Sequence, residues 1–364
     1  MRMRRDRPER SRAVAIWLFV VAAMVFGMVL VGGGTRLTDS GLSITEWRPV
    51  TGTIPPLSDA DWAREFARYR EIPQYRQVNA GMSLGEFQFI YWWEWGHRFL
   101  GRVIGAAFLL PFLAFLALRR LPRRLIWPCV GLFVLGGLQG LVGWWMVASG
   151  LVGRVSVAPE RLTTHLGLAL FLFCALVWTG LEAWKGPRRT EAARARPGPW
   201  PWVMLGAVFL QCLLGGLVAG NDAGRVYTDW PMFNGAWLPP DYAGDGLWGT
   251  IAHSVGAVQL HHRLGAYLLF AGALVYAAWA WRRGRPERHE AAGLAVLVTL
   301  QAVLGIATLM HAAPLGLSAA HQGGAVVLLA VVTAMVWRSR RETGSRGRTL
   351  DAGERPVSLQ AQRV

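Results

Sequence analysis

Long apolar segments recur along the chain and are separated by shorter polar or charged segments. A helix rises about 1.5 Å per residue, so roughly 20 apolar residues are needed to cross about 30 Å of lipid hydrocarbon. Eight segments approach that length: 13–33, 99–118, 126–148, 162–183, 201–220, 260–281, 291–311 and 319–337. The pattern predicts an all-α integral membrane protein with eight transmembrane helices and with both termini on one side.

Three short motifs occur twice, at nearly constant separation along the chain. Segment 94–101 resembles 259–265, segment 138–143 resembles 300–305, and segment 165–169 resembles 321–325. Four predicted helices separate equivalent positions, so the two halves have the same orientation in the membrane. The repeats predict two tandem pseudo-symmetric four-helix bundles. The expected divisions are a tail at 1–12, an N-terminal bundle at 13–184 with a long outward loop at 35–83, a linker at 185–199, a C-terminal bundle at 200–337 and a tail at 338–364.

The composition agrees with a membrane protein, since 53% of the residues are hydrophobic and only 16% are charged. Soluble globular proteins carry about 25% charged residues and are therefore excluded. The net charge of +16 comes from both tails and from the loops 119–124, 185–196 and 282–288, whereas the alternate loops are close to neutral. By the positive-inside rule these basic segments are cytoplasmic. The arginines flank helices without interleaved aromatic residues, so the charge predicts no nucleic-acid partner.

The three cysteines, Cys129, Cys174 and Cys212, all lie inside predicted helices. None can take part in a disulfide framework of the outward loops, and no CxxC metal motif is present. We expect them to be small apolar residues.

Four of the eight histidines lie near the starts of the second, fourth, sixth and eighth predicted helices. They are His97, His165, His262 and His321. One such histidine alone is most often a structural hydrogen-bonding group. Two per half at repeat-equivalent positions, on the non-cytoplasmic side, instead predict bis-histidine ligation of a haem iron within each bundle. The neighbour of His262, His261, leaves the choice of ligand at that position open.

Glu94 precedes His97 by three residues and so lies on the same helix face. Its repeat counterpart is Gln259, which cannot ionise. A carboxylate near one ring edge could stabilise a developing cation or move a proton, or it could be neutralised by Arg98. Arg98 and its counterpart Arg263 could bind haem propionates. Alternatively, their side chains could extend from the helix ends to the membrane–water interface.

The outward loop at 35–83 contains Trp47 and several prolines and ends at a Ser83–Glu86 capping box, which predicts a helix start there. We expect an ordered cap over the N-terminal haem pocket. The cap either limits the access of water and oxidant to the pocket or is a folded lid without a catalytic part. Segment 221–242 is the expected counterpart over the second pocket.

The sequence resembles the haem A synthase family, in the form found in alphaproteobacteria and mitochondria. The resemblance covers roughly residues 14–337. Its motifs are 33–57, 86–98, 139–151, 161–165, 216–224, 230–232 and the two C-terminal histidine motifs. Some family members carry a cysteine pair in an outward loop, whereas this chain does not.

The resemblance implies stepwise oxidation of the methyl group at porphyrin position 8 of haem O to a formyl group. The product would be haem A for an aa3-type cytochrome oxidase. His97 and His165 would hold the substrate haem with Glu94 at the reacting methyl, and His262 and His321 would hold haem b for electron transfer. The implied location is a bacterial inner membrane. The implied partners are haem O synthase, an electron donor, cytochrome oxidase assembly factors, membrane lipid and possible further copies of the chain.

Two other functions fit part of the sequence. A dihaem cytochrome that transfers electrons between a quinone and a partner would explain the histidines but gives Glu94 no role. A transporter is suggested by the tandem repeats, but it would need polar groups or broken helices near the bilayer midplane. The informative residues lie instead toward the outer face.

Overall fold

The computed structural model describes residues 9–187 and 198–342, and over these residues it is helical without β-strands. Eight helices are long and apolar enough to cross a membrane, which confirms the predicted fold class. They are α1 (Arg12–Leu37), α4 (Leu84–Ala117), α5 (Ile126–Ala148), α6 (Pro159–Lys185), α7 (Trp200–Gly220), α9 (Val255–Arg282), α10 (Arg288–Met310) and α11 (Leu315–Glu342).

Helix α4 begins much earlier than the apolar segment at 99–118 predicts. Its N-cap is Ser83, whose side chain accepts a hydrogen bond from the Glu86 N–H while the Glu86 carboxylate accepts one from the Ser83 N–H. This capping box satisfies backbone donors that would otherwise be unpaired at the helix start. Glu94 and His97 interrupt the apolar run, so hydropathy alone misses the first turns. Both residues therefore lie well inside a continuous helix.

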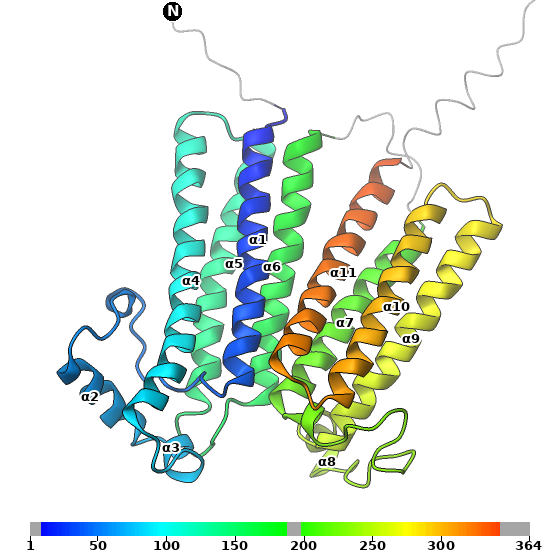
Figure 1. Ribbon diagram of the computed structural model, residues 1–364. Helices are drawn as coiled ribbons and strands as arrows, with labels where there is room; N and C mark the ends of the chain where they lie inside the picture. The colour runs from blue at the N-terminus through cyan, green and yellow to red at the C-terminus, as the bar shows by residue number, and fades with distance from the viewer. Residues whose placement is uncertain (1–8, 188–197, 343–364) are drawn as a thin grey trace, which may run out of the picture.

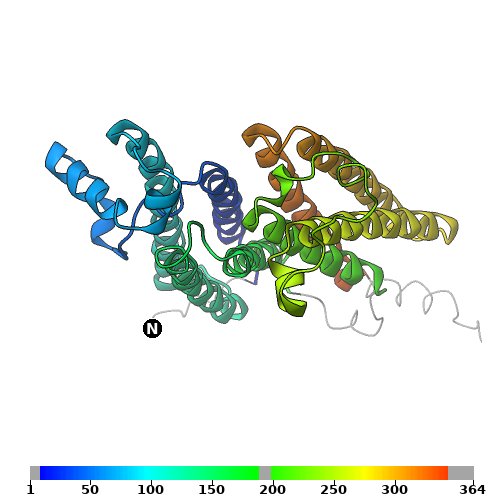
Figure 2. The ribbon, with the colours of Figure 1, turned by 90° about the horizontal axis from the view of Figure 1, so that it is seen from below.

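The eight helices form two rings of four (Figures 1 and 2). In one ring α1 and α5 each contact both α4 and α6, and in the other α7 and α10 each contact both α9 and α11. The rings meet where α6 contacts α7 and where α11 contacts α1 and α6. The pseudo-symmetry between the rings, and the bundle boundaries at 13–184 and 200–337, stay predictions.

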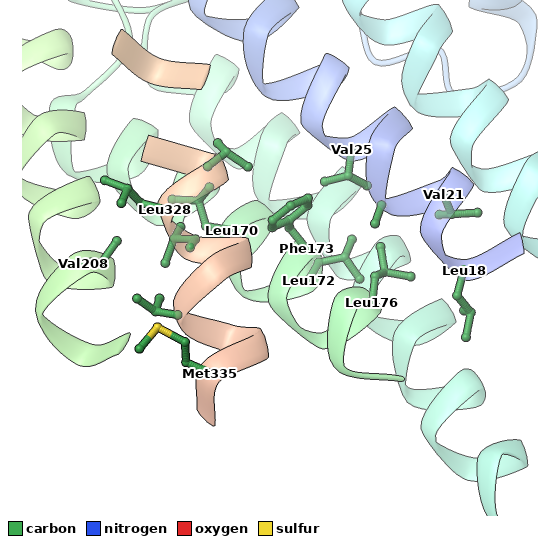
Figure 3. Close-up of a cluster of buried hydrophobic side chains, with 14 of the residues drawn as sticks. Leu18, Val21, Val25, Leu170, Leu172, Phe173, Leu176, Val208, Leu328 and Met335 are labelled. Carbon is green, nitrogen blue, oxygen red and sulfur yellow. The ribbon is translucent and has the colours of Figure 1, made fainter. Parts of the chain in front are cut away.

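The interface between the rings is filled by buried apolar side chains. Figure 3 shows Val25 of α1, Phe173 of α6, Val208 of α7 and Leu328 of α11 in one cluster. Lipid tails are as apolar as these side chains, so close packing and dispersion, more than water exclusion, stabilise the contact. Cys129 is fully buried in the same cluster, and all three cysteines are free thiols, as predicted.

The loop after α1 folds into a cap, which we call the N-terminal lid (residues 38–83). It contains α2 (Asp59–Tyr69) and α3 (Pro73–Gln77). A second apolar core packs the lid on α4, with Trp62, Phe66 and Tyr69 against Phe87. The equivalent segment of the other half, which we call the C-terminal lid (residues 221–254), contains α8 (Gly246–Ala252).

Both lids lie at the lower end of the molecule in Figure 1, where α1 and α7 end and α4 and α9 begin. The loops after α4 and α9, whose arginines were predicted to be cytoplasmic, lie at the opposite end. The chain is a multi-pass membrane protein with its charged loops at one end and its folded lids at the other.

Candidate haem-binding site

The four predicted ligands lie on four different helices, toward the lid end of the molecule. His97 is on α4, His165 on α6, His262 on α9 and His321 on α11. Each ring of helices therefore contains two of them. The helices that carry them run in the same direction, because each begins at the lid end.

The C-terminal pair has the spacing that a haem requires. The ring centres of His262 and His321 are 6.4 Å apart, with the ring planes at 84°. With metal–nitrogen bonds of about 2 Å, two axial imidazoles of one iron have ring centres about 6 Å apart. The residues present therefore fit a six-coordinate haem iron. In the N-terminal ring, His97 and His165 lie on α4 and α6, which both contact α1 and α5.

No site for a bare metal ion competes with this arrangement. Among residues 9–187 and 198–342, no group of three or more His, Cys, Asp or Glu side chains is placed to hold a metal ion. A porphyrin supplies four nitrogen ligands itself, so a haem needs only the two axial histidines.

Each of the four histidine rings lies against a glycine of the preceding long helix. A Cβ atom placed on that glycine would come within 2.7–3.2 Å of the histidine Cε1. The pairs are Gly32 with His97, Gly143 with His165, Gly215 with His262 and Gly305 with His321. Such short distances leave no room for a side chain, so the glycines form the wall on which the rings rest. For two of these glycines the sequence carried a signal, because Gly143 and Gly305 are the last residues of the repeated motif at 138–143 and 300–305.

Three glutamines, each one helical turn before such a glycine, hold three of the histidines. The amide Nε2 of each lies 3.0–3.2 Å from the histidine Nδ1 and donates to the main-chain oxygen of the same histidine at 2.7–3.0 Å. The pairs are Gln139 with His165, Gln211 with His262 and Gln301 with His321. Sequence reasoning noted two of these glutamines in the repeat but assigned them no role.

Glu94 is almost fully buried, with 3% of its surface exposed, and its carboxylate faces the N-terminal lid. Its Oε2 accepts hydrogen bonds from the Ser43 hydroxyl at 2.7 Å and from the Ile44 N–H at 2.8 Å. Its Oε1 accepts one from Arg98 at 2.5 Å, which also donates to the main-chain oxygens of Ile44 and Glu46. The pair of Glu94 and Arg98 thus fastens the lid to α4.

In the C-terminal half, the neutral amide of Gln259 takes the place of the carboxylate. The Gln259 amide donates to the main-chain oxygens of Ala223 and Tyr227, and its Oε1 accepts from Arg263 at 2.9 Å. Arg263 also donates to main-chain oxygens of the C-terminal lid and lies over the Phe233 ring, 4.0 Å from its centre. At this contact, the N-terminal half has a carboxylate that accepts from lid donors, whereas the C-terminal half has a neutral amide that donates to lid carbonyls.

Comparison with known proteins identifies the family. The sequence model of the cytochrome oxidase assembly protein family COX15-CtaA matches residues 15–333. The chain is 60% identical to the Heme A synthase of Caulobacter sp. strain K31, over 92% of this chain and 98% of the relative. It is 58% identical to the Heme A synthase of Caulobacter vibrioides, with the same coverage, and 48% identical to that of Maricaulis maris, over 91% and 97%. The chain belongs to the haem A synthase family.

The other four histidines of this family member contact residues outside the two histidine pairs. His261 Nε2 lies 3.2 Å from the Tyr242 hydroxyl of the C-terminal lid, so it faces away from His321. His253 lies beside Glu160, His289 stacks edge-on against Trp281, and His311 caps its own helix. This arrangement favours His262 over His261 as the ligand.

A cavity of about 280 Å³ lies between the N-terminal lid and α4 of this haem A synthase family member. Its lining includes Arg48 of the lid and Tyr91, Arg98 and Arg102 of α4, but none of the four paired histidines. Arg102 donates to the main-chain oxygens of Arg48 and Pro49. The cavity therefore belongs to the contact between the lid and α4.

Proposed function

We propose that this chain oxidises the porphyrin methyl group of haem O in steps to a formyl group, giving haem A for an aa3-type cytochrome oxidase. The observation that carries the proposal is a pair of histidines in each ring of helices of a haem A synthase family chain, with ring centres 6.4 Å apart in the C-terminal pair and with a buried carboxylate three residues before His97 where the C-terminal half has Gln259. His97 and His165 hold the substrate haem in this proposal, and His262 and His321 hold a haem b. When bound, that haem b would supply one-electron transfer.

Glu94 is the residue that distinguishes the substrate half. Its carboxylate lies three residues before His97, in a buried site where a charge acts strongly on its surroundings. We infer that it stabilises positive charge that develops at the reacting methyl, or takes a proton from it. Arg98 donates to this carboxylate and to two lid carbonyls, so it fixes the position of the carboxylate relative to the lid.

Arg98 and Arg263 keep the lids closed over the two pockets, which limits the access of water to the reacting group. Their nitrogens donate mostly to main-chain oxygens of the lids. A contact with the haem propionates stays a prediction.

The proposal also covers the orientation of the protein in the membrane and its partners. By the distribution of arginines, both termini face the cytoplasm and the lids face the outer side of a bacterial inner membrane. The partners are a haem O synthase that supplies the substrate, an electron donor, cytochrome oxidase assembly factors and surrounding lipid. Assembly into homo-oligomers is part of the same expectation.

Haem extraction followed by chromatography tests the proposal directly. The chain is expressed with and without a haem O synthase, and the extracted haems are separated. We expect haem A and its partly oxidised precursors only when haem O is supplied. Recovery of protohaem alone in both cultures would contradict the proposal and favour the electron-transfer cytochrome.

A further inference from the structure

The cavity between the N-terminal lid and α4 lies at the periphery of the N-terminal ring of helices. Its lining comes from lid residues between 44 and 68 and from Tyr91, Arg98 and Arg102 of α4. In both ribbon views α2 lies beside α4, on the side away from α1, α5 and α6 (Figures 1 and 2). A ligand of this cavity would therefore come from the surrounding membrane or from the outer solution, and not from the interior of the bundle.

The cavity lining includes five arginines, and four of them are paired with carboxylates. The pairs are Arg48 with Glu46 and Glu65, Arg64 with Asp61, Arg68 with Glu46 and Glu65, and Arg98 with Glu94. Within residues 9–187 and 198–342, the fifth, Arg102, forms no ion pair. Its Nε and Nη2 each donate to a lid main-chain oxygen at 2.8 Å, whereas its buried Nη1 has no hydrogen-bond partner among the described residues. The cavity thus has one unbalanced positive charge and one unused donor.

Arg102 lies near the outer boundary of the lipid hydrocarbon. It precedes Ala117, at the end of α4 that is predicted to be cytoplasmic, by 15 residues, which is about 22 Å of helix. The hydrocarbon core is about 30 Å thick, so a long side chain at this position can reach the level of the lipid phosphates. A charge at this depth is costly unless a group of opposite charge accompanies it. Because the described part of the chain supplies no carboxylate, a lipid headgroup is the nearest source of that charge.

The lid loop beside Arg102 presents apolar side chains at the surface. Val50, Ile54 and Leu57 are 80%, 68% and 78% exposed, and Ile54 and Leu57 also line the cavity. Exposed apolar side chains next to a basic group are typical of surfaces that lie on a membrane. The rim of the cavity is therefore suited to acyl chains, and Arg102 is suited to a phosphate.

The C-terminal half lacks this charge. The separation between His97 and His262 places Tyr267 at the position that corresponds to Arg102. The Tyr267 hydroxyl already accepts a hydrogen bond from the Trp230 indole at 2.9 Å. The unbalanced charge is thus a property of the N-terminal half and not of both halves.

We propose that this cavity binds the headgroup of one anionic phospholipid of the outer leaflet, such as phosphatidylglycerol. A phosphodiester carries one negative charge, which matches the unbalanced charge of Arg102, and a guanidinium donates strong hydrogen bonds to phosphate oxygens. Val50, Ile54 and Leu57 contact the acyl chains. The bound lipid holds the N-terminal lid on the membrane surface, and this inference does not depend on the proposed reaction.

Native mass spectrometry of the purified full-length protein in detergent tests the site. The protein is titrated with phosphatidylglycerol and with phosphatidylcholine, which has a phosphodiester but no net charge. We expect one phosphatidylglycerol to bind about 10-fold or more tightly than phosphatidylcholine, because choline would add a second positive charge to the cavity. An excess of inorganic phosphate should not displace the lipid, since free phosphate makes no contact with the apolar rim.

Two variants remove the unbalanced charge in different ways. Arg102→Gln should abolish the preference for phosphatidylglycerol, whereas Arg102→Lys should keep it because the cation remains. Thr51→Asp adds a carboxylate to the cavity lining and leaves Arg102 and its two lid contacts in place, so it should also abolish the preference. Arg70→Gln is the matched control, because it removes an exposed arginine of the same lid that does not line the cavity, and it should bind as the wild type does.

Circular dichroism verifies that each variant is folded. Equal binding of the two lipids by the wild type would overturn the inference, as would a preference that persists in Arg102→Gln or, if that variant does not fold, in Thr51→Asp. Displacement of the lipid by inorganic phosphate would also overturn it, in favour of a site for free anions. Haem extraction tests the proposed function separately from all of these outcomes.

Discussion

At the residue scale, Glu94 and Gln259 occupy equivalent places with different charge. Each is buried, and each accepts a hydrogen bond from the arginine four residues later. The polarity of the lid contact is reversed, because Glu94 accepts from the Ser43 hydroxyl and the Ile44 N–H whereas Gln259 donates to two main-chain oxygens. The carboxylate therefore holds the N-terminal lid as well as having the chemical role that we propose for it.

Replacement of Glu94 by glutamine removes the charge with little change in size. We expect Glu94→Gln to retain both haems but to lose haem A formation by about 100-fold or more, the usual range for a lost acid or base. Chromatography of extracted haems measures the product, and the Soret absorbance measures haem content. Gln259→Glu is the reciprocal control and should leave haem A formation intact. Full activity of Glu94→Gln would remove Glu94 from the reaction.

The second histidine pair should account for one spectral component. Either His262→Ala or His321→Ala should abolish the low-spin haem b signal, because a bis-histidine iron loses an axial ligand. Visible and paramagnetic resonance spectra of the purified variants measure this. His253→Ala and His311→Ala remove histidines that face other partners and should keep the signal. A retained haem b signal in His321→Ala would contradict the assigned pair.

The sequence points to single residues more readily than to the groups that contact them. The histidines and Glu94 stand out because they are polar residues at repeat-equivalent positions in apolar surroundings, and their roles stay predictions. Gln211 was missed, since its partner is on another helix and nothing along the chain links position 211 to position 262.

At the scale of elements, the glycines behind the four histidines set how closely the neighbouring helices of a ring approach each other at that level. Gly143→Ala would place a Cβ atom 2.8 Å from the His165 Cε1, so the ring or the helix must move. We expect loss of the N-terminal haem while haem b remains, measured by the haem content of the purified protein.

Gly140→Ala on the same helix is a matched control for this substitution. A Cβ atom there would meet nothing within 4 Å. Both variants gain the same helix propensity, about 1 kcal/mol, so any difference between them reports the contact with the histidine. Equal haem content in the two variants would argue against a wall at Gly143.

The number and order of helices followed from hydropathy, whereas their ends did not. Helix α4 extends to Leu84 because a capping box and aromatic packing against the N-terminal lid stabilise turns that hydropathy excludes. The lid was predicted to be ordered, but α2 and α3 inside it were not predicted. Their apolar residues face a small local core, which gives too short a pattern to separate from loop sequence.

At the scale of the whole molecule, the two rings of helices pack against each other through side chains of α1, α6, α7 and α11. They are therefore joined by more than the linker at 185–199. Cleavage at a protease site inserted between residues 188 and 197 should therefore leave the two pieces together. We expect them to elute as one complex from size-exclusion chromatography in mild detergent, with both haems bound. The uncut protein is the control, and separate elution of the pieces would show that the linker holds the rings together.

Each histidine rests on the long helix that comes just before it in the chain: α1 before α4, α5 before α6, α7 before α9 and α10 before α11. Each histidine and the glycine behind it are therefore both present as soon as two successive long helices have left the ribosome and entered the membrane. The N-terminal pair of histidines and the glycines behind them are all encoded before the end of α6. During biosynthesis, haem capture by the first four long helices can then begin while the second half of the protein is still being translated.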